Sequence, residues 1–262
     1  RVKAKSATII IQNPYTGEIL AMANHPSFDG NDFSTINSSI LNNAAISKVF
    51  EPGSTFKVIT AAAALNEDMV SLHEKFYCEK GIYYIERIPI RDHEKWGWLT
   101  FSKIIEHSSN IGISKVADRI GKYTLYKYIR DFGFGNFTGI NLPGEIKGIL
   151  RNPSKWSKIS ISRISFGQEI GVTAIQLTTA FSVIANGGIL YQPRVVSMIL
   201  DNQNKVIKKF HTVKIRKIIS SKTARLLTSI LTRAVEQGTG IKARLEGYEI
   251  AGKTGTAQKF NQ

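Results

Sequence analysis

The chain has 262 residues, of which 42% are hydrophobic and 21% charged, and its formal net charge at pH 7 is +15. These values are ordinary for a globular protein and allow a sizeable core. The positive surplus favours an anionic neighbour, but the basic residues are scattered rather than gathered with aromatic residues, which argues against a nucleic-acid binder. The single cysteine, Cys78, excludes an internal disulfide.

The sequence also lacks the patterns of a metal site and of a membrane span. No metal or other cofactor is expected, because the histidines do not have the spacing of metal ligands; they are His25, His73, His93, His107 and His211. No apolar run is long enough to cross a membrane. Because the chain starts just before a predicted strand and without an initiator Met, we expect any membrane anchor to lie outside it.

The first predicted unit is a β-hairpin. Two β-rich runs, 6–12 and 18–24, flank the turn sequence "NPYTG" at 13–17. Asparagine, proline and glycine are the residues that favour a tight turn between two strands. The polar stretch 25–50 that follows is predicted to be an extended crossing loop.

A helix is expected next, at about 54–66. Pro52 and Gly53 stop the preceding chain, and Ser54 then stands at the predicted helix start, where serine is a favoured cap. The body of this helix is an apolar run rich in alanine, and it is therefore predicted to be buried.

The rest of the chain mixes short strands with helices. Strand-forming residues occupy 81–90, a second hairpin is expected within 195–210, and 247–260 alternates like a strand. Four helices are predicted, at 100–107, 111–121, 174–188 and 221–240. This order predicts an α/β lobe at about 1–67 and 190–262, and a mainly helical lobe at about 68–189.

Ser54 and Lys57 form the first candidate for chemistry. Their spacing of three places both side chains on one helix face, and a helix start favours developing negative charge. A hydroxyl is a poor nucleophile until a base removes its proton, and an amine desolvated among apolar residues has a lowered pKa suited to that task. Taken alone, the pattern favours an ordinary helix cap beside a surface lysine.

Two further motifs carry polar groups. Ser108-Ser109-Asn110 interrupts two predicted helices and offers a hydroxyl to relay a proton and a carboxamide to hold a substrate amide. The run Lys253 to Thr256 reads "KTGT". On a strand it would place Lys253 and Gly255 on one side and two threonine hydroxyls on the other. Glycine would let a substrate backbone approach, and the hydroxyls suit a carboxylate.

The three motifs occur in the order S-x-x-K, S-x-N and K-T-G, which is the order found in penicillin-binding proteins and serine β-lactamases. The chain resembles the transpeptidase domain of class B penicillin-binding proteins, with the division (septal) type as the nearest match and the elongation and sporulation types as open alternatives. The resemblance covers most of the chain, through "TGEILAMANHPSFDGNDF", "VFEPGSTFKVITAAAAL", "HSSNIGISKVA", "ISFGQEIGVTAIQLTTAFSVIANGG" and "IAGKTGTAQK".

The resemblance implies a penicillin-binding transpeptidase (serine β-lactamase-like) fold: an α/β lobe with an antiparallel sheet flanked by helices, plus an all-helical lobe. In that family two further strands and a helix follow the K-T-G strand. Residues 1–262 are therefore expected to be one transpeptidase domain truncated at its C-terminus, with a strand at 250–258 that lacks its normal partner and with doubtful activity in this form.

The resemblance also implies roles for single residues. Ser54 would attack the penultimate D-Ala carbonyl of a peptidoglycan stem peptide, with Lys57 as base. Ser108, linked to Lys57 and Lys253, would protonate the leaving amine. Asn110 would hold the substrate amide, and Thr254 and Thr256, beside Gly255, would bind the terminal carboxylate. The backbone N–H groups of Ser54 and Thr256 would form the oxyanion hole.

The implied partners are stem peptides ending in D-Ala-D-Ala, β-lactams, a membrane-embedded glycosyltransferase and the divisome, with no nucleic acid. The implied location is the extracytoplasmic face of a bacterial plasma membrane. Two alternatives stay open: a β-lactam-hydrolysing or β-lactam-sensing protein of the same fold, and a catalytically silent divisome scaffold. Against hydrolysis, the loop 141–156 contains Glu145 but no E-x-x-L-N pattern.

Overall fold

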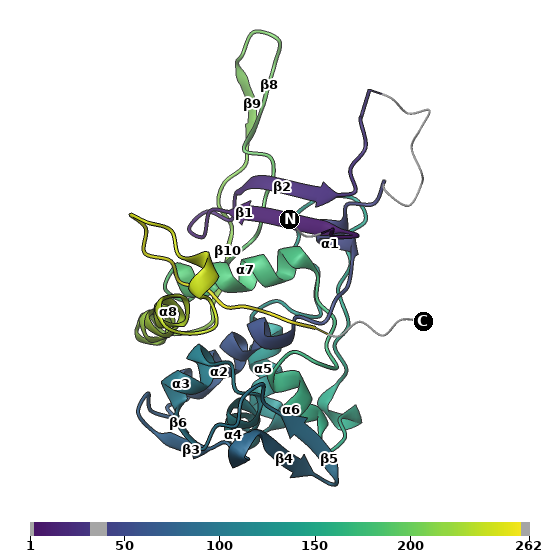
Figure 1. Ribbon diagram of the computed structural model, residues 1–262. Coiled ribbons are helices and arrows are strands. Elements are labelled where there is room, and N and C mark those ends of the chain that lie inside the picture. Colours follow the sequence, from purple (N-terminus) through teal and green to yellow (C-terminus); the bar gives the residue numbers. More distant parts are fainter. Residues whose placement is uncertain (1–2, 32–40, 258–262) are drawn as a thin grey trace.

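The computed structural model describes residues 3–31 and 41–257, and its first unit is the predicted hairpin (Figure 1). Strand β1 (Ala7–Gln12) pairs antiparallel with β2 (Ile19–His25). The turn closes as its residues predict, because the Asn13 amide donates to the Glu18 carbonyl at 2.8 Å and the Gly17 amide donates to the Asn13 carbonyl at 3.0 Å. This prediction is confirmed.

The predicted helix at 54–66 is present in two parts. A 3₁₀ turn, η2 (Gly53–Phe56), leads into the α-helix α2 (Lys57–Asn66), and the loop before it contains the short helix α1 (Ala44–Ser47). Gly53 has a φ of +55°, which turns the chain sharply into η2 before the α-helical hydrogen bonds begin. Ser54 therefore lies in the 3₁₀ turn, and Lys57 is the first residue of α2.

The middle of the chain forms a mainly helical body, in the lower part of Figure 1. Its helices are α3 (Phe101–Glu106), α4 (Asn110–Ile120), α5 (Lys122–Asp131), α6 (Ser160–Ser165) and the 3₁₀ turns η3 (Glu79–Gly81) and η4 (Pro153–Lys155). Two antiparallel pairs accompany them: β3 (Lys75–Tyr77) with β6 (Trp98–Thr100), and β4 (Ile82–Ile85) with β5 (Ile88–Arg91). This part of the chain is therefore mainly rather than purely helical, and the predicted strand run 81–90 folds back on itself as the β4–β5 hairpin.

The last third supplies the helices and strands around β1. Its elements are α7 (Ala174–Ala185), β7 (Ile189–Tyr191), β8 (Met198–Leu200), β9 (Val206–Lys209), β10 (Lys214–Lys217), α8 (Ser221–Glu236) and η5 (Ile241–Ala243). Helix α7 packs on β1 and β7, and β10 pairs with β7. The β8–β9 hairpin projects from the top of Figure 1 and confirms the second predicted hairpin.

The core is built around α2. Every residue of this helix except Asn66 is buried, and it contacts α4, α5 and α8. At its start the Phe56 ring meets the Phe134 ring edge-on, with centroids 5.1 Å apart. This packing fixes the position of the turn that contains Ser54 and shields the Lys57 side chain from water. How the chain divides into two lobes stays a prediction.

The strand predicted at 247–260 is wrong for the residues that the structure describes. From Ile250 to Ala257 the chain has no strand assignment; residues 258–260 lie outside the described parts. One backbone hydrogen bond ties this segment to α8, from the Gly252 amide to the Leu231 carbonyl at 3.2 Å. Alternating residues need a neighbouring strand before they form a ladder, and no strand pairs with this segment within residues 3–31 and 41–257.

Among the helices of the described residues, none has the length and apolar character that a membrane span requires.

Candidate active site

Ser54 lies half-buried at a cleft of about 580 Å³. The lining comes from segments that are far apart in the chain: the η2 turn, the end of β5, the start of α4, the stretch after α6, and the C-terminal segment. The residues predicted for chemistry that line it are Ser54, Asn110 and Thr256. The fold therefore brings the three motifs to one place.

Lys57, three residues after Ser54, is fully buried and does not line this cleft. Its Nζ donates to Ser108 Oγ at 3.0 Å and also to the Ser108 carbonyl oxygen. Burial lowers the pKa of Lys57 well below its ordinary value, the positive charge of Lys253 lowers it further, and the Asp92 carboxylate opposes both. The amine is thus held where its neutral, proton-accepting form is favoured.

Ser108 joins the two lysines. It lies between α3 and α4 in the left-handed region, with a φ of +61°, and is buried. Lys253 Nζ donates to the same Ser108 Oγ at 3.0 Å, so this hydroxyl receives one hydrogen bond from each lysine. Burial lowers the pKa of Lys253 to about 8. A hydroxyl between two amines of lowered pKa is well placed to pass a proton between them.

Two glycines, Gly53 and Gly255, allow the K-T-G segment to pack closely against the η2 turn. A Cβ at Gly53 would lie 2.3 Å from the Thr256 carbonyl oxygen, and a Cβ at Gly255 would lie 2.8 Å from the Thr55 methyl group. Only a hydrogen at each position permits this approach. The backbone of Thr256 consequently lies beside Ser54, although the segment is not a strand.

Asp92 is a site residue that the sequence analysis missed. Its carboxylate accepts from Ser109 Oγ at 2.6 Å and from the backbone amides of Asn110 and Ile111 at 2.5 and 3.1 Å. It therefore caps the N-terminus of α4, together with Ser109. The Asn110 side-chain amide donates to the Arg91 carbonyl at 2.8 Å. In the sequence, Asp92 was only an acidic residue after a strand.

Thr239 was missed in the same way. It lies in the loop after α8, and its hydroxyl accepts a hydrogen bond from Thr254 Oγ1 at 3.0 Å. Lys253 Nζ lies 3.4 Å from the same Thr254 hydroxyl. The pair of threonines and the lysine thus form one polar edge of the site, of the kind that suits a carboxylate.

Together these groups can support acyl transfer through a serine. The site has a hydroxyl nucleophile, a desolvated amine, a hydroxyl relay and a second cation. Within residues 3–31 and 41–257, no hydrogen bond joins Ser54 Oγ to Lys57 or Ser108, and such bonds are often loose before substrate binds.

Comparison with known proteins shows that the chain is similar to penicillin-binding proteins. Residues 7–262 match the family described as "Penicillin binding protein transpeptidase domain". Stage V sporulation protein D of Bacillus subtilis is 39% identical over 254 residues, which are 95% of this chain and 39% of that protein. The peptidoglycan D,D-transpeptidase FtsI of Escherichia coli is 33% identical over 98% of this chain and 42% of its own length.

Solved structures give the same result. Penicillin binding protein 3 from Mycobacterium tuberculosis, complexed with aztreonam, matches with a TM-score of 0.91 and 30% sequence identity. The match covers 98% of this chain and 59% of that one. A peptidoglycan glycosyltransferase from Burkholderia ambifaria matches with a TM-score of 0.84 and 28% identity over 98% of this chain and 75% of its own. The chain thus spans about two fifths of the length of the curated relatives described above.

Proposed function

The chain belongs to the penicillin-binding protein transpeptidase family, and on this premise we propose that it is the acyl-transfer domain of a class B peptidoglycan D,D-transpeptidase of the division type. The observation that carries the proposal is the hydrogen-bonded set Lys57–Ser108–Lys253, together with a cleft that brings Ser54, Asn110 and Thr256 to one place. No step needs a metal or cofactor.

In the proposed reaction, Ser54 Oγ attacks the carbonyl of the penultimate D-Ala of a stem peptide, and Lys57 takes its proton. The new C–O bond forms as the C–N bond to the terminal D-Ala breaks. Ser108, supplied with a proton through the lysine pair, gives it to the departing amine. The amine of a second stem peptide then attacks the acyl-enzyme, and the cross-link forms as Ser54 is released.

Binding and charge stabilisation come from the other motifs. Asn110 holds the substrate amide, while Thr254 and Thr256, beside Gly255 and Lys253, hold the terminal carboxylate. The backbone N–H groups of Ser54 and Thr256 form the oxyanion hole, an arrangement in which one lost donor typically costs about 10²–10³ in rate. The close seating of the K-T-G segment on the η2 turn supports this pairing.

β-Lactams are proposed to acylate the same serine, as they are bound by the similar Mycobacterium tuberculosis protein. The proposed setting is the extracytoplasmic face of a bacterial plasma membrane, with an anchor outside residues 1–262. There the domain would work beside a membrane-embedded glycosyltransferase and the divisome. Its basic charge suits the anionic polymers and lipids of that setting.

Labelling with a fluorescent penicillin tests the proposal. In the full-length protein, wild type should form a stable covalent adduct and Ser54→Ala should form none. Ser197→Ala, which changes an exposed serine on the segment before β8, should label like wild type. Equal labelling of wild type and Ser54→Ala would overturn the nucleophile assignment. Rapid multiple turnover of a chromogenic cephalosporin would favour the β-lactamase alternative instead, and absence of labelling in a folded wild type would favour a silent scaffold.

A further inference from the structure

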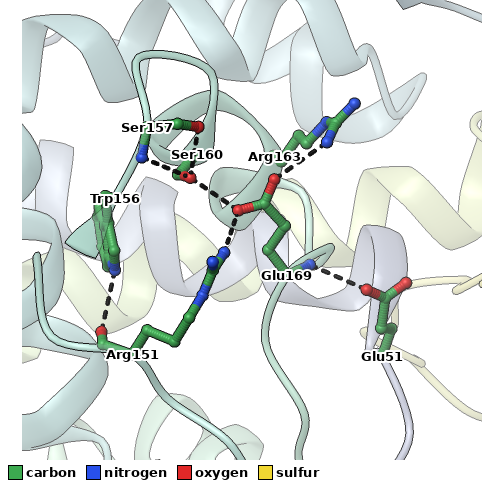
Figure 2. A network of polar contacts seen from close by, with 7 residues as sticks. All are labelled: Glu51, Arg151, Trp156, Ser157, Ser160, Arg163 and Glu169. Atoms are coloured by element: carbon green, nitrogen blue, oxygen red, sulfur yellow. Dashed lines mark hydrogen bonds and ion pairs between the residues drawn. The ribbon is translucent and has the colours of Figure 1, made fainter.

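A network of polar and charged groups is centred on Glu169 and reaches Glu51 (Figure 2). Glu169 Oε1 accepts from Arg163 Nη1 at 3.1 Å, while Oε2 accepts from Ser160 Oγ at 2.7 Å and forms an ion pair with Arg151. In addition, the Glu169 backbone amide donates to the Glu51 carboxylate at 2.9 Å. Glu51 stands three residues before Ser54.

The Glu169 backbone is held in an uncommon conformation. Its φ of +58° lies in the left-handed region, which glycine adopts readily and a glutamate rarely does. Such a conformation persists only when the surroundings fix it, and here both carboxylate oxygens are bonded. Burial raises the pKa of Glu169, but Ser160 and the two arginines outweigh this and keep the pKa below its ordinary value. The side chain therefore remains ionised and bonded at neutral pH.

The same stretch is fastened to the nucleophile turn by backbone contacts. Phe50 and Val172 exchange two hydrogen bonds, at 3.0 and 2.9 Å, and the Gly53 amide donates to the Gly167 carbonyl at 3.1 Å. The Glu51–Glu169 hydrogen bond lies between these two attachments in the sequence. Unlike them, it is made by a side chain, the Glu51 carboxylate. Ser54 thus follows directly from a segment whose position depends on residues 167–172.

Arg163 gives Glu169 a second connection to the site. Its side chain is 37% exposed and lines the same cleft as Ser54, Asn110 and Thr256. Among the described residues, its guanidinium has one side-chain partner, Glu169, which leaves further N–H donors for a ligand in the cleft. Arg151, which pairs with the other carboxylate oxygen, does not line the cleft.

We propose that Glu51 and Glu169 are positioning residues for the reaction at Ser54: Glu51 sets the nucleophile turn against residues 167–172, and Glu169 orients Arg163 as a substrate-binding cation of the cleft. The inference rests on the proposed acyl-transfer function. It differs from a purely structural ion pair because it predicts an effect on the acylation step itself, beyond any loss of stability. A misplacement of about 1 Å in such a site can cost roughly 10²-fold in rate.

Stopped-flow acylation by a fluorescent penicillin separates the initial binding constant from the acylation rate constant. Glu51→Ala, which removes the acceptor, should slow acylation about 10- to 100-fold with little change in the binding constant. Glu51→Gln, whose amide oxygen can still accept, should recover most of that rate. Glu169→Gln and Arg163→Gln should weaken initial binding severalfold, because both leave the cleft cation missing or unoriented.

Arg151→Gln is the matched control. It breaks an ion pair of the same carboxylate, but with an arginine that does not line the cleft, so it should lower the melting temperature as Glu169→Gln does and still acylate like wild type. If wild type, Glu51→Ala and Glu169→Gln had equal binding constants and equal acylation rate constants, the inference would be overturned. The proposed function would still stand as long as labelling depended on Ser54. An equal loss of rate in Arg151→Gln would also overturn it, since the network would then be structural only. Loss of Ser54 dependence would instead remove the proposed function.

Discussion

Replacing Gly53 by alanine should slow acylation of Ser54 much more than it destabilises the fold. Two effects follow from the structure. The φ of +55° becomes strained once a Cβ is present, at a cost of roughly 1–2 kcal/mol in the free energy of unfolding. The Cβ would also lie 2.3 Å from the Thr256 carbonyl oxygen, a backbone atom that cannot rotate away. The K-T-G segment must therefore move away from Ser54 by several tenths of an ångström or more.

The size of the functional loss follows from that displacement. If the Thr256 backbone leaves the oxyanion hole, the acylation rate constant should fall about 10²–10³-fold. The strain by itself should lower the melting temperature by roughly 2–8 °C, taking about 2–4 °C for each kcal/mol in a chain of this size. The assays are stopped-flow acylation by a fluorescent penicillin and thermal unfolding followed by circular dichroism.

Gly144→Ala separates the two effects. Gly144 has a φ of +83°, but a Cβ there would meet no heavy atom within 4 Å. This variant should lose a similar amount of stability and keep the wild-type acylation rate. If Gly53→Ala acylated as fast as Gly144→Ala, the close approach of the K-T-G segment would have no part in catalysis, and the reasoning would be refuted.

The lysine pair should control how the protein responds to pH. Lys253→Gln removes a positive charge that lowers the pKa of Lys57, so the rising limb of acylation rate against pH should move to higher pH. Asp92→Asn removes a negative charge that raises the same pKa, so its limb should move to lower pH; shifts in one direction for both variants would contradict this account. Because the pKa of Lys253 is about 8 in the folded protein and ordinarily 10.5, the unfolded chain binds more protons between these values. The free energy of unfolding of wild type should therefore rise relative to that of Lys253→Met from about pH 8 to about pH 10.5 in urea melts, and a constant difference would argue against burial of the lysine.

Elements with strong local signals could be predicted from the sequence alone. The first hairpin forms around a turn that Asn13 and Gly17 close by their own hydrogen bonds. Helix α7 starts where Thr173 and Gln176 form reciprocal capping bonds, and it was predicted at nearly its observed length. By contrast, α6 has only six residues and packs on α4, so tertiary contacts rather than its own pattern stabilise it, and it was not predicted.

The sequence by itself determined which residue types could perform the chemistry, since the order of Ser54, Lys57, Ser108 and Lys253 was enough to indicate the family. Only the tertiary structure decided how they meet. Lys57 and Lys253 reach one hydroxyl across 51 and 145 positions of sequence, distances over which no local pattern operates. The capping of α4 by Asp92 depends on the same long-range folding. The K-T-G segment gives the converse case: its alternation predicted a strand, yet a strand exists only as part of a pair, and packing on the Ser54 turn positions this segment instead.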